Sequence, residues 1–470
     1  MDKIKLLQTR RSKVLEAGSE IRKTISELVD ADSFVELSGY SFSKNEFYGE
    51  DAEGEGVVTG FATVEGYPVY VAAQNFKVMS GGVSKANCEK IFKCLTLAEK
   101  NSTPVVYILN SLCVQVGEGV TVLEGLASVL AKSARLHGVV PQFTIVKGEV
   151  YGQAALFTAN ADFNFFLKEG VLAANSPLVI SAKSGKNLPK EEVGGAKALD
   201  KTNLVSFTAE NMAEIRSKIF KIIDLLPDYN SVVVENGADL NRANAKLNQQ
   251  CSSDELVKAV FDAESFVEVG NAYSPEVKCI LGRVGGVSVA AVVFDGEEGT
   301  ELDQYNTAKI NWFLEFAAYY SLPFISFADT LSVAANTCVN NSLVLKQISK
   351  FMENFELLEN AKISVVYKKA VGMGYTLFAA KSMGYDYTLA FANAKIALFD
   401  SVAGAEIELA ADVRTREKLA EKYADENSDP VNAAKDGYID DIIEPQFRSE
   451  EHTSELQSQY LIAALQMLLK

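Results

Sequence analysis

The chain has 470 residues, of which 48% are hydrophobic and 23% are charged, and its formal net charge is −17. This length is enough for two or three domains, and the composition is that of a globular protein rather than a disordered one. The acidic balance argues against a nucleic-acid partner, because binding to a phosphate backbone depends on clusters of Lys and Arg.

The apolar residues are spread along the chain in short runs. None approaches the roughly 20 residues that a membrane-spanning helix needs, so no membrane insertion is expected. The N-terminus is charged and lacks the apolar core of a signal peptide. The cysteines show neither metal-ligand nor redox spacing, so we expect a reducing cytoplasm, buried thiols and no metal site. They are Cys88, Cys94, Cys113, Cys251, Cys279 and Cys338.

The first half of the chain alternates short strands with helices. The opening residues 1–29 have apolar side chains loosely on one side, which predicts a helix. Strands are predicted at 57–63 and 68–73 around a turn at Glu65 and Gly66, since Gly supplies the positive φ of such turns. The remaining predicted elements are a helix at 86–99, strands at 105–109 and 143–146, helices at 121–136 and 151–159, and a strand at 162–167. This order predicts an α/β fold with a helix-covered sheet.

Only two histidines are present, His137 and His452. A Ser-His-Asp triad or a His-ligated zinc site would therefore have to use one of them. His137 lies between a helix pattern and an apolar strand, and we favour a helix-end or turn role for it over catalysis.

A polar segment divides the chain. We place a linker at 229–253, between a first domain at 1–228 and a second at 254–470. The second domain repeats the order of the first. Its predicted strands are 280–282, 288–293, 324–327, 363–367 and 387–391, and its predicted helices are 306–320, 342–356 and 374–382.

One segment near the C-terminus, residues 448–458 (RSEEHTSELQS), interrupts what otherwise reads smoothly into a closing helix. It resembles the translation of a sequencing adapter, and the alternative is a genuine polar helix start capped by Ser449. We assign no function to it or to His452.

The two halves also share sequence. VDADSFVEL at 29–37 returns as FDAESFVEV at 261–269, and three further blocks recur in the same order. A copy more than two hundred residues away indicates a duplicated domain, because solenoid repeats recur every 20–50 residues.

The most informative positions are two matching strand-to-helix turns. IVKGEVYGQAALF places Gly152 and Gln153 at such a turn, and VVYKKAVGMGYTLF places Gly372, Met373 and Gly374 at the equivalent one. A helix N-terminus has N–H groups without partners, and two convergent ones form an oxyanion hole for a thioester. A tight packing turn is the alternative interpretation of either segment alone.

Four segments together carry a resemblance to a known family: GVVTGFATVEGYPVYVAAQNF, MSGGVSKANCEKI, EEVGGAKAL and NAAKDGYIDDIIEP. With the repeat, the chain resembles the β-type carboxyltransferase subunit of biotin-dependent acyl-CoA carboxylases and decarboxylases over nearly its whole length. The resemblance implies a tandem duplication of two crotonase-like ββα superhelical domains. It also implies a carboxyl transfer between carboxybiotin and an acyl-CoA of the propionyl, methylmalonyl or acetyl type.

The resemblance further implies roles for particular residues. Backbone N–H groups of Gly152 and Gln153 would hold the thioester enolate, and those of Gly372 and Met373 the biotin ureido oxygen. Cofactor-binding glycines are implied at Gly81, Gly82 and Gly374. The family's active sites form between the first domain of one subunit and the second domain of another, so a homo-oligomer, from dimer to hexamer, is expected.

The implied partners supply what the chain lacks. The sequence has no Met-Lys-Met biotinylation site and no ATP-binding glycine loop, so biotin would come on a separate carrier protein and ATP use would fall to a partner. A biotin carboxylase or a membrane decarboxylase subunit is the further partner implied, and a coenzyme A thioester is the substrate.

Departures from the family pattern leave two alternatives open. Gln153 and Met373 stand where the family has a second glycine, and LNSLCVQVGEG and DTLSVAAN have lost others. One alternative is therefore a catalytically degenerate paralogue that serves as a structural subunit. The other is a crotonase-like hydratase or hydrolase, which would need an acidic residue beside the hole, Glu149 or Glu118, although both suit solvated turns.

Overall fold

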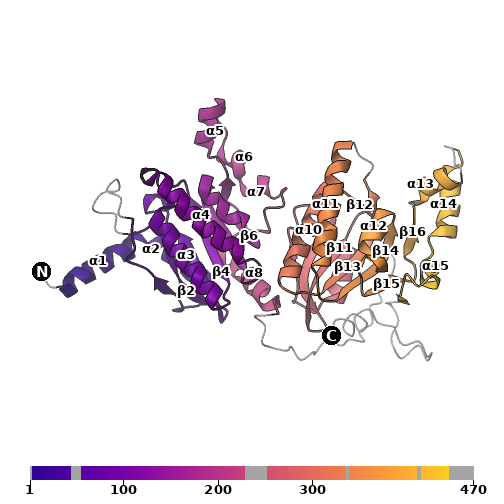
Figure 1. Ribbon diagram of the computed structural model, residues 1–470, viewed down its shortest axis with the longest axis horizontal. Helices are drawn as coiled ribbons and strands as arrows, with labels where there is room; N and C mark the ends of the chain where they lie inside the picture. Colours follow the sequence, from indigo (N-terminus) through magenta and orange to yellow (C-terminus); the bar gives the residue numbers. More distant parts are fainter. Residues whose placement is uncertain (1–2, 44–53, 228–250, 335–337, 410–413, 444–470) are drawn as a thin grey trace. The chain divides into compact units, whose positions relative to one another are not determined.

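The computed structural model describes residues 3–43, 54–227, 251–334, 338–409 and 414–443 (Figure 1). The chain divides into two compact units, Met1–Ile223 and Asp224–Lys470, each with its own sheet. Most of the predicted linker at 229–253 and all of the segment 448–458, with His452, lie outside the described residues.

Unit 1 contains the elements of the first half. In chain order they are α1 (Lys3–Ala17), α2 (Ser19–Leu28), β1 (Val35–Leu37), β2 (Val57–Val64), β3 (Tyr67–Gln74), η2 (Met79–Gly81), α3 (Lys85–Lys100), β4 (Val105–Ser111), η3 (Val116–Glu118), α4 (Val120–Arg135), β5 (Gln142–Tyr151), η4 (Gly152–Ala159), β6 (Phe163–Leu167), β7 (Val171–Ala173), α5 (Pro177–Ser184), α6 (Lys190–Gly194), α7 (Ala196–Leu199), β8 (Phe207–Ala209) and α8 (Met212–Leu225).

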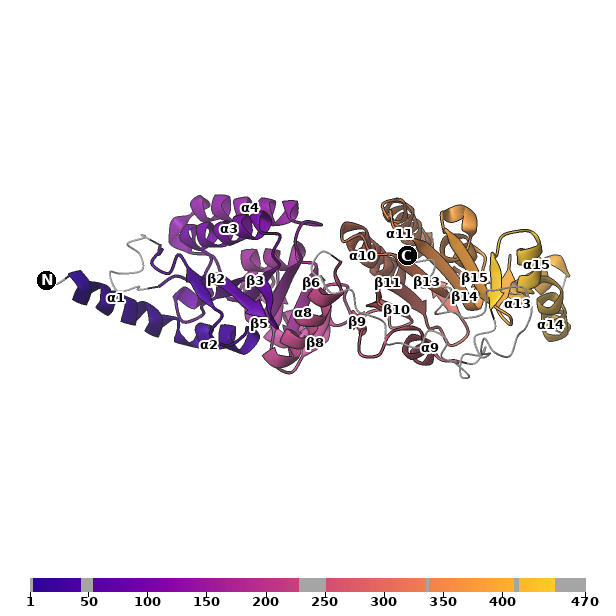
Figure 2. The same cartoon turned by 90° about the horizontal axis from the view of Figure 1, so that it is seen from below.

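The sheet of unit 1 has the strand order β1-β2-β3-β4-β5-β6-β8, and β7 pairs with the end of β5. The first three strands are antiparallel, and β3 to β6 and β8 run parallel. Figure 2 shows α3 and α4 on one face and α2 and α8 on the other. Because both faces are covered, β4 is apolar almost throughout, and its residues from Val105 to Leu109 are all buried.

Unit 2 repeats this plan. Its elements are α9 (Ser253–Val260), β9 (Val267–Val269), β10 (Val277–Val284), β11 (Val287–Phe294), β12 (Thr300–Leu302), α10 (Gln304–Tyr319), β13 (Phe324–Val333), α11 (Cys338–Glu356), β14 (Lys362–Val371), α12 (Met373–Phe378), η5 (Lys381–Met383), β15 (Tyr387–Phe391), β16 (Lys395–Ala397), α13 (Ser401–Glu408), α14 (Arg416–Asn427), α15 (Pro430–Lys435) and β17 (Asp441–Ile443).

The second sheet has the order β9-β10-β11-β13-β14-β15-β17, with β16 on β14 as β7 is on β5. Its helices α10 and α11 lie on one face and α9 on the other, the same layers as in unit 1 (Figure 2). The predicted duplication is thus visible in the order and pairing of the strands. The short strand β12, which pairs with β13, corresponds to a single parallel bridge between Val83 and Val114 in unit 1.

The repeated sequence phrase closes the same hairpin in each unit. The Asp30 carboxylate accepts hydrogen bonds from the N–H groups of Glu65 (2.9 Å) and Gly66 (2.9 Å), which form the turn between β2 and β3. In unit 2 the Asp262 carboxylate accepts from Gly285 (3.1 Å) and Gly286 (2.7 Å). Each aspartate thus satisfies the donors of a turn whose residues have positive φ. The predicted turn at Glu65 and Gly66 is confirmed.

Several predicted elements differ in detail. The N-terminal helix is two helices, because the chain leaves helical geometry at Gly18 (φ −108°, ψ 15°). Residues 152–159 form a 3₁₀ helix, and α12 ends at Phe378, short of the predicted Ser382. Strands β5, β13 and β14 run four to six residues beyond their predicted ends. These extensions pair with β7, β12 and β16, which are separated from them in sequence and give no local signal.

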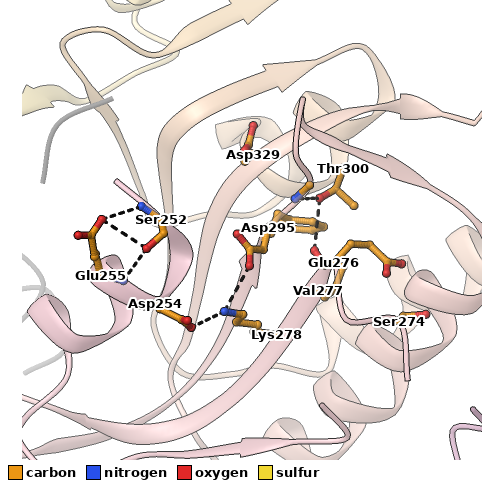
Figure 3. Close-up of polar contacts among 12 residues, drawn as sticks. Ser252, Asp254, Glu255, Ser274, Glu276, Val277, Lys278, Asp295, Thr300 and Asp329 are labelled. Atoms are coloured by element: carbon orange, nitrogen blue, oxygen red, sulfur yellow. Dashed lines mark hydrogen bonds and ion pairs between the residues drawn. The ribbon is translucent and has the colours of Figure 1, made fainter. Parts of the chain in front are cut away.

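The start of α9 is fixed by the polar contacts in Figure 3. Ser252 and Glu255 form a capping box, in which the Glu255 N–H donates to the Ser252 hydroxyl at 3.2 Å. Lys278 of β10 lies between Asp254 of α9 and Asp295, whose carboxylate is 3.3 Å away. A capping residue of this kind stabilises a helix by about 1 kcal/mol. The N-terminus of α9 is therefore well anchored.

The thiols mostly behave as predicted. Cys88, Cys94, Cys251 and Cys279 are buried, but Cys113 is exposed in the loop after β4, so the expectation was wrong there. Within the described residues, no helix is both long and apolar enough to cross a membrane.

Candidate active site

The two predicted turns occupy equivalent places in the two units. Gly152 follows β5, whose last residue pairs with Ala173, and Gly372 follows β14, whose last residue pairs with Ala397. Their φ angles are +61° and +56°, a region that L side chains rarely adopt. Glycine is therefore required at both positions by the backbone, whatever the turn does chemically.

The space beside the two glycines differs. A methyl group at Gly152 would meet no other atom of the chain within 4 Å, so the backbone there is open to a ligand. A methyl group at Gly372 would meet the Ser332 side chain at 3.1 Å. Gln153 and Met373, the residues that replace family glycines, are both exposed, with Met373 47% exposed. Neither side chain is packed away inside its own unit.

The second turn has a specific set of donors. The Gly372 N–H donates to the Ala397 carbonyl at 3.1 Å, so it is engaged in holding β16. The N–H groups of Met373 and Gly374 begin α12 and have no intrahelical acceptor. A methyl group at Gly374 would lie 2.2 Å from the Leu331 carbonyl oxygen, so this glycine lets α12 pack on the end of β13.

Gly81 lies against the end of β4, and Gly82 lies against the loop that follows it. A methyl group at Gly81 would stand 2.1 Å from the Asn110 carbonyl oxygen, and one at Gly82 would stand 2.5 Å from the Gln115 side-chain nitrogen. Contacts within the chain thus explain both glycines. Their predicted role in binding a cofactor remains a prediction.

The candidate acidic residues are both engaged. Glu149 is paired with Lys190 at 2.9 Å and accepts a hydrogen bond from the Tyr151 hydroxyl at 3.0 Å. The hydrogen bond from Lys190 is the main reason that the pKa of Glu149 is lowered. Glu118 accepts hydrogen bonds from the Ser43 hydroxyl and the Lys85 N–H. The lowered pKa of Glu149 keeps its carboxylate ionised, which makes it poorly suited to act as a general acid.

His137 follows the end of α4, and its Nδ1 lies 3.5 Å from the Asp162 carboxylate. The Asp162 carboxylate also accepts the Gln142 N–H at 2.7 Å, at the start of β5. His137 thus lies at a helix end. It is near the end of the sheet where β5 begins, whereas the Gly152 turn is at the end where β5 stops.

A pocket opens beside the second turn in unit 2. Val371 and Ala397, the paired ends of β14 and β16, form part of its wall, and Phe399 and Tyr423 add aromatic surface. The sequence did not indicate this pocket, because its walls come from segments that are far apart along the chain. The other lining residues are Leu331, Lys369, Lys395, Asp400, Ser401, Ala424 and Ser428.

Comparison with known families matches residues 14–461 to the carboxyl transferase domain. The methylmalonyl-CoA decarboxylase subunit alpha of Veillonella parvula is 27% identical, over 94% of this chain and 93% of its own. The propionyl-CoA carboxylase beta chain of Saccharopolyspora erythraea is also 27% identical, over 93% and 89%.

The fold of a solved structure agrees closely. Transcarboxylase 12S, described as a hexamer with methylmalonyl-coenzyme A and methylmalonic acid bound, superposes with a TM-score of 0.87. The alignment covers 99% of this chain and 95% of that one, at 23% identity. The predicted fold, two crotonase-like α/β domains in tandem, is confirmed.

The strand order and the superposition define a fold of two crotonase-like domains in tandem. The chain belongs to the carboxyl transferase domain family. It is a carboxyltransferase of the type found in biotin-dependent acyl-CoA carboxylases and decarboxylases.

Proposed function

We propose that this chain transfers a carboxyl group between a short-chain acyl-CoA, propionyl or methylmalonyl, and biotin on a separate carrier protein. The relatives named above act on these thioesters, and the chain aligns with them over nearly their whole length. The observation that carries the proposal is the duplicated turn, with its forced positive φ at Gly152 and Gly372.

The two turns are assigned different roles. The open space beside Gly152 supports assigning this turn to the enolate of the acyl-CoA. A thioester oxygen can approach the backbone there without meeting a side chain. Bound carboxybiotin would supply the carboxyl group and the base. In unit 2 the N–H groups of Met373 and Gly374 are the donors suited to a ureido oxygen, since that of Gly372 is engaged by Ala397.

The pocket beside Gly372 supports the assignment of unit 2. Its wall of Val371, Ala397 and Phe399 is apolar and suits a compact, largely uncharged bicyclic ring. These residues would bind and orient the ring, while backbone N–H groups polarise its ureido oxygen.

The assembly is also part of the proposal. Transcarboxylase 12S forms a hexameric core of a multienzyme complex, and the Veillonella relative is a subunit of a decarboxylase. We infer a homo-oligomer that works with a biotin carrier, and with a carboxylase or decarboxylase partner. The unpaired cysteines of the described residues support a reducing cytoplasm as the setting.

The alternatives have less support. The relatives compared here are named as carboxylase or decarboxylase subunits, which gives no support to a purely structural paralogue. A hydratase or hydrolase would need a free acidic group beside Gly152, and Glu149 is instead paired with Lys190 and Tyr151.

The proposal is tested by mixing the purified protein with a biotinylated carrier and methylmalonyl-CoA. Carboxylation of the carrier, detected by its mass, is the expected result. If instead the thioester is hydrolysed without carboxylation of the carrier, a different crotonase-like activity is indicated.

A further inference from the structure

Tyr151 stands directly beside the proposed acyl-CoA turn. It is the last residue of β5 and precedes Gly152, and it pairs with Ala173 of β7. The whole residue is only 4% exposed. A large, buried aromatic residue therefore directly precedes the glycine whose backbone would hold the thioester.

A polar tether holds this ring in place. The Tyr151 hydroxyl donates to Glu149 Oε2 at 3.0 Å, and Lys190 Nζ of α6 lies 2.9 Å from Glu149 Oε1. Because Lys190 keeps the pKa of Glu149 low, the carboxylate is charged at neutral pH and the tether persists. The ring is thus fixed to β5 and, through Glu149, to α6.

The equivalent position in unit 2 carries a smaller residue. Val371 occupies the position of Tyr151, since Val371 pairs with Ala397 of β16 as Tyr151 pairs with Ala173 of β7. Lys369 replaces Glu149 in the same register, so the tether has no counterpart there. At this position the chain forms a pocket, and Val371, Lys369 and Ala397 line it.

We propose that Tyr151 sets the upper size of the acyl group that the Gly152 turn accepts. The phenol fills space that unit 2 leaves open beside Val371, and its tether prevents the ring from swinging aside. A bulky residue in a substrate pocket excludes longer chains more strongly than it favours short ones. This inference rests on the proposed function, because it takes Gly152 as the acyl-CoA turn.

The test compares two donors of different size. Carboxylation of a biotinylated carrier is measured with methylmalonyl-CoA and with butylmalonyl-CoA, and kcat/KM is taken for each. In Tyr151→Val the ratio of butylmalonyl-CoA to methylmalonyl-CoA should rise by about tenfold or more. Tyr151→Phe keeps the ring but loses the hydrogen bond to Glu149, so the ratio should rise, but by less than in Tyr151→Val. Tyr151→Leu serves if the valine variant does not fold.

Two results are distinguishable. An unchanged ratio in folded Tyr151→Val or Tyr151→Leu would overturn the size role, while transfer from methylmalonyl-CoA would still support the carboxyltransferase. Absence of transfer from either donor in the unaltered protein would instead contradict the proposed function. A purely structural role of Tyr151 would lower both kcat/KM values together and leave their ratio unchanged.

Discussion

Single glycines carry the chemistry proposed for this chain. At Gly152 the backbone has φ +61° and no neighbouring atom where a side chain would stand. Gly66, in the hairpin turn of the same unit, has φ +84° and equally open surroundings. Both glycines have a positive φ that L side chains rarely adopt, but only Gly152 lies at the proposed site. They form a matched pair for experiment.

Gly152→Val should reduce carboxyl transfer by about a hundredfold or more, as much as the loss of an oxyanion-hole donor, because the added side chain would stand where the thioester oxygen approaches the backbone N–H groups. Gly66→Val should impose a similar backbone strain, about 1–2 kcal/mol, and leave kcat/KM for transfer near its original value. Both variants are compared by transfer rate and by thermal unfolding. Equal transfer rates in the two variants would remove Gly152 from the mechanism.

The sequence predicted the positions of the two turns but not which atoms are available there. Gly152 and Gly372 could be recognised in the sequence because each follows an apolar strand, at matching places in the two repeats. The engagement of the Gly372 N–H by Ala397 was not predictable, since β16 is far along the chain and too short to give a pattern. The tether of Tyr151 through Glu149 to Lys190 depends in the same way on a contact over 41 residues.

At the scale of secondary-structure elements, the repeated phrase acts through its aspartate. Burial opposes ionisation of Asp30, but hydrogen bonds from Thr63, Gly66 and Glu65 outweigh it and hold the pKa below its usual value. The ionised carboxylate therefore stabilises the β2–β3 hairpin above the unfolded pKa of about 3.9, and this contribution is lost as the pH falls through the lowered folded value.

Asp30→Asn should destabilise unit 1 by about 1–3 kcal/mol at neutral pH, because a turn donor loses a charged acceptor. The difference from the unaltered protein should shrink as the pH falls through the lowered pKa of folded Asp30. Thermal unfolding at several pH values measures it. Asp32→Asn, at an exposed neighbouring position, is the control, and a pH-independent difference for Asp30→Asn would contradict the account.

A buried lysine joins a helix to the sheet in each unit. Lys90 of α3 donates to the carbonyl of Val57, the first residue of β2, at 2.8 Å. Lys309 of α10 donates to the carbonyl of Val277, the first residue of β10, at 2.7 Å, and also to those of Tyr273 and Ser274. Burial lowers the pKa of both ammonium groups. In each unit a buried lysine thus holds the start of a strand by hydrogen bonding to its backbone carbonyl.

Lys309→Met should loosen the segment 273–277 more than Lys90→Met loosens the start of β2, because three carbonyls lose their donor in unit 2. Amide hydrogen exchange measures each segment separately, which is needed because a protein of two units need not unfold in one step. Unchanged exchange at 273–277 in Lys309→Met would show that the lysine does not hold the turn.

At the scale of the whole molecule, the duplication was the most predictable property. VDADSFVEL and FDAESFVEV recur because each supplies the hairpin cap and the edge strand of its unit, so the constraint is local and visible in sequence. Strand ends were less predictable. The last residues of β5 and β14 are set by pairing with β7 and β16, not by their own pattern.

The central claim is that two copies of one turn cooperate in moving a carboxyl group from a thioester to biotin. Its most direct test is the transfer of isotopically labelled carboxyl from methylmalonyl-CoA to a biotinylated carrier by the purified protein. The account predicts that label appears on the carrier and that propionyl-CoA accumulates in equal amount. Release of propionyl-CoA at the same rate without the carrier, or persistence of transfer in Gly152→Val, would contradict it.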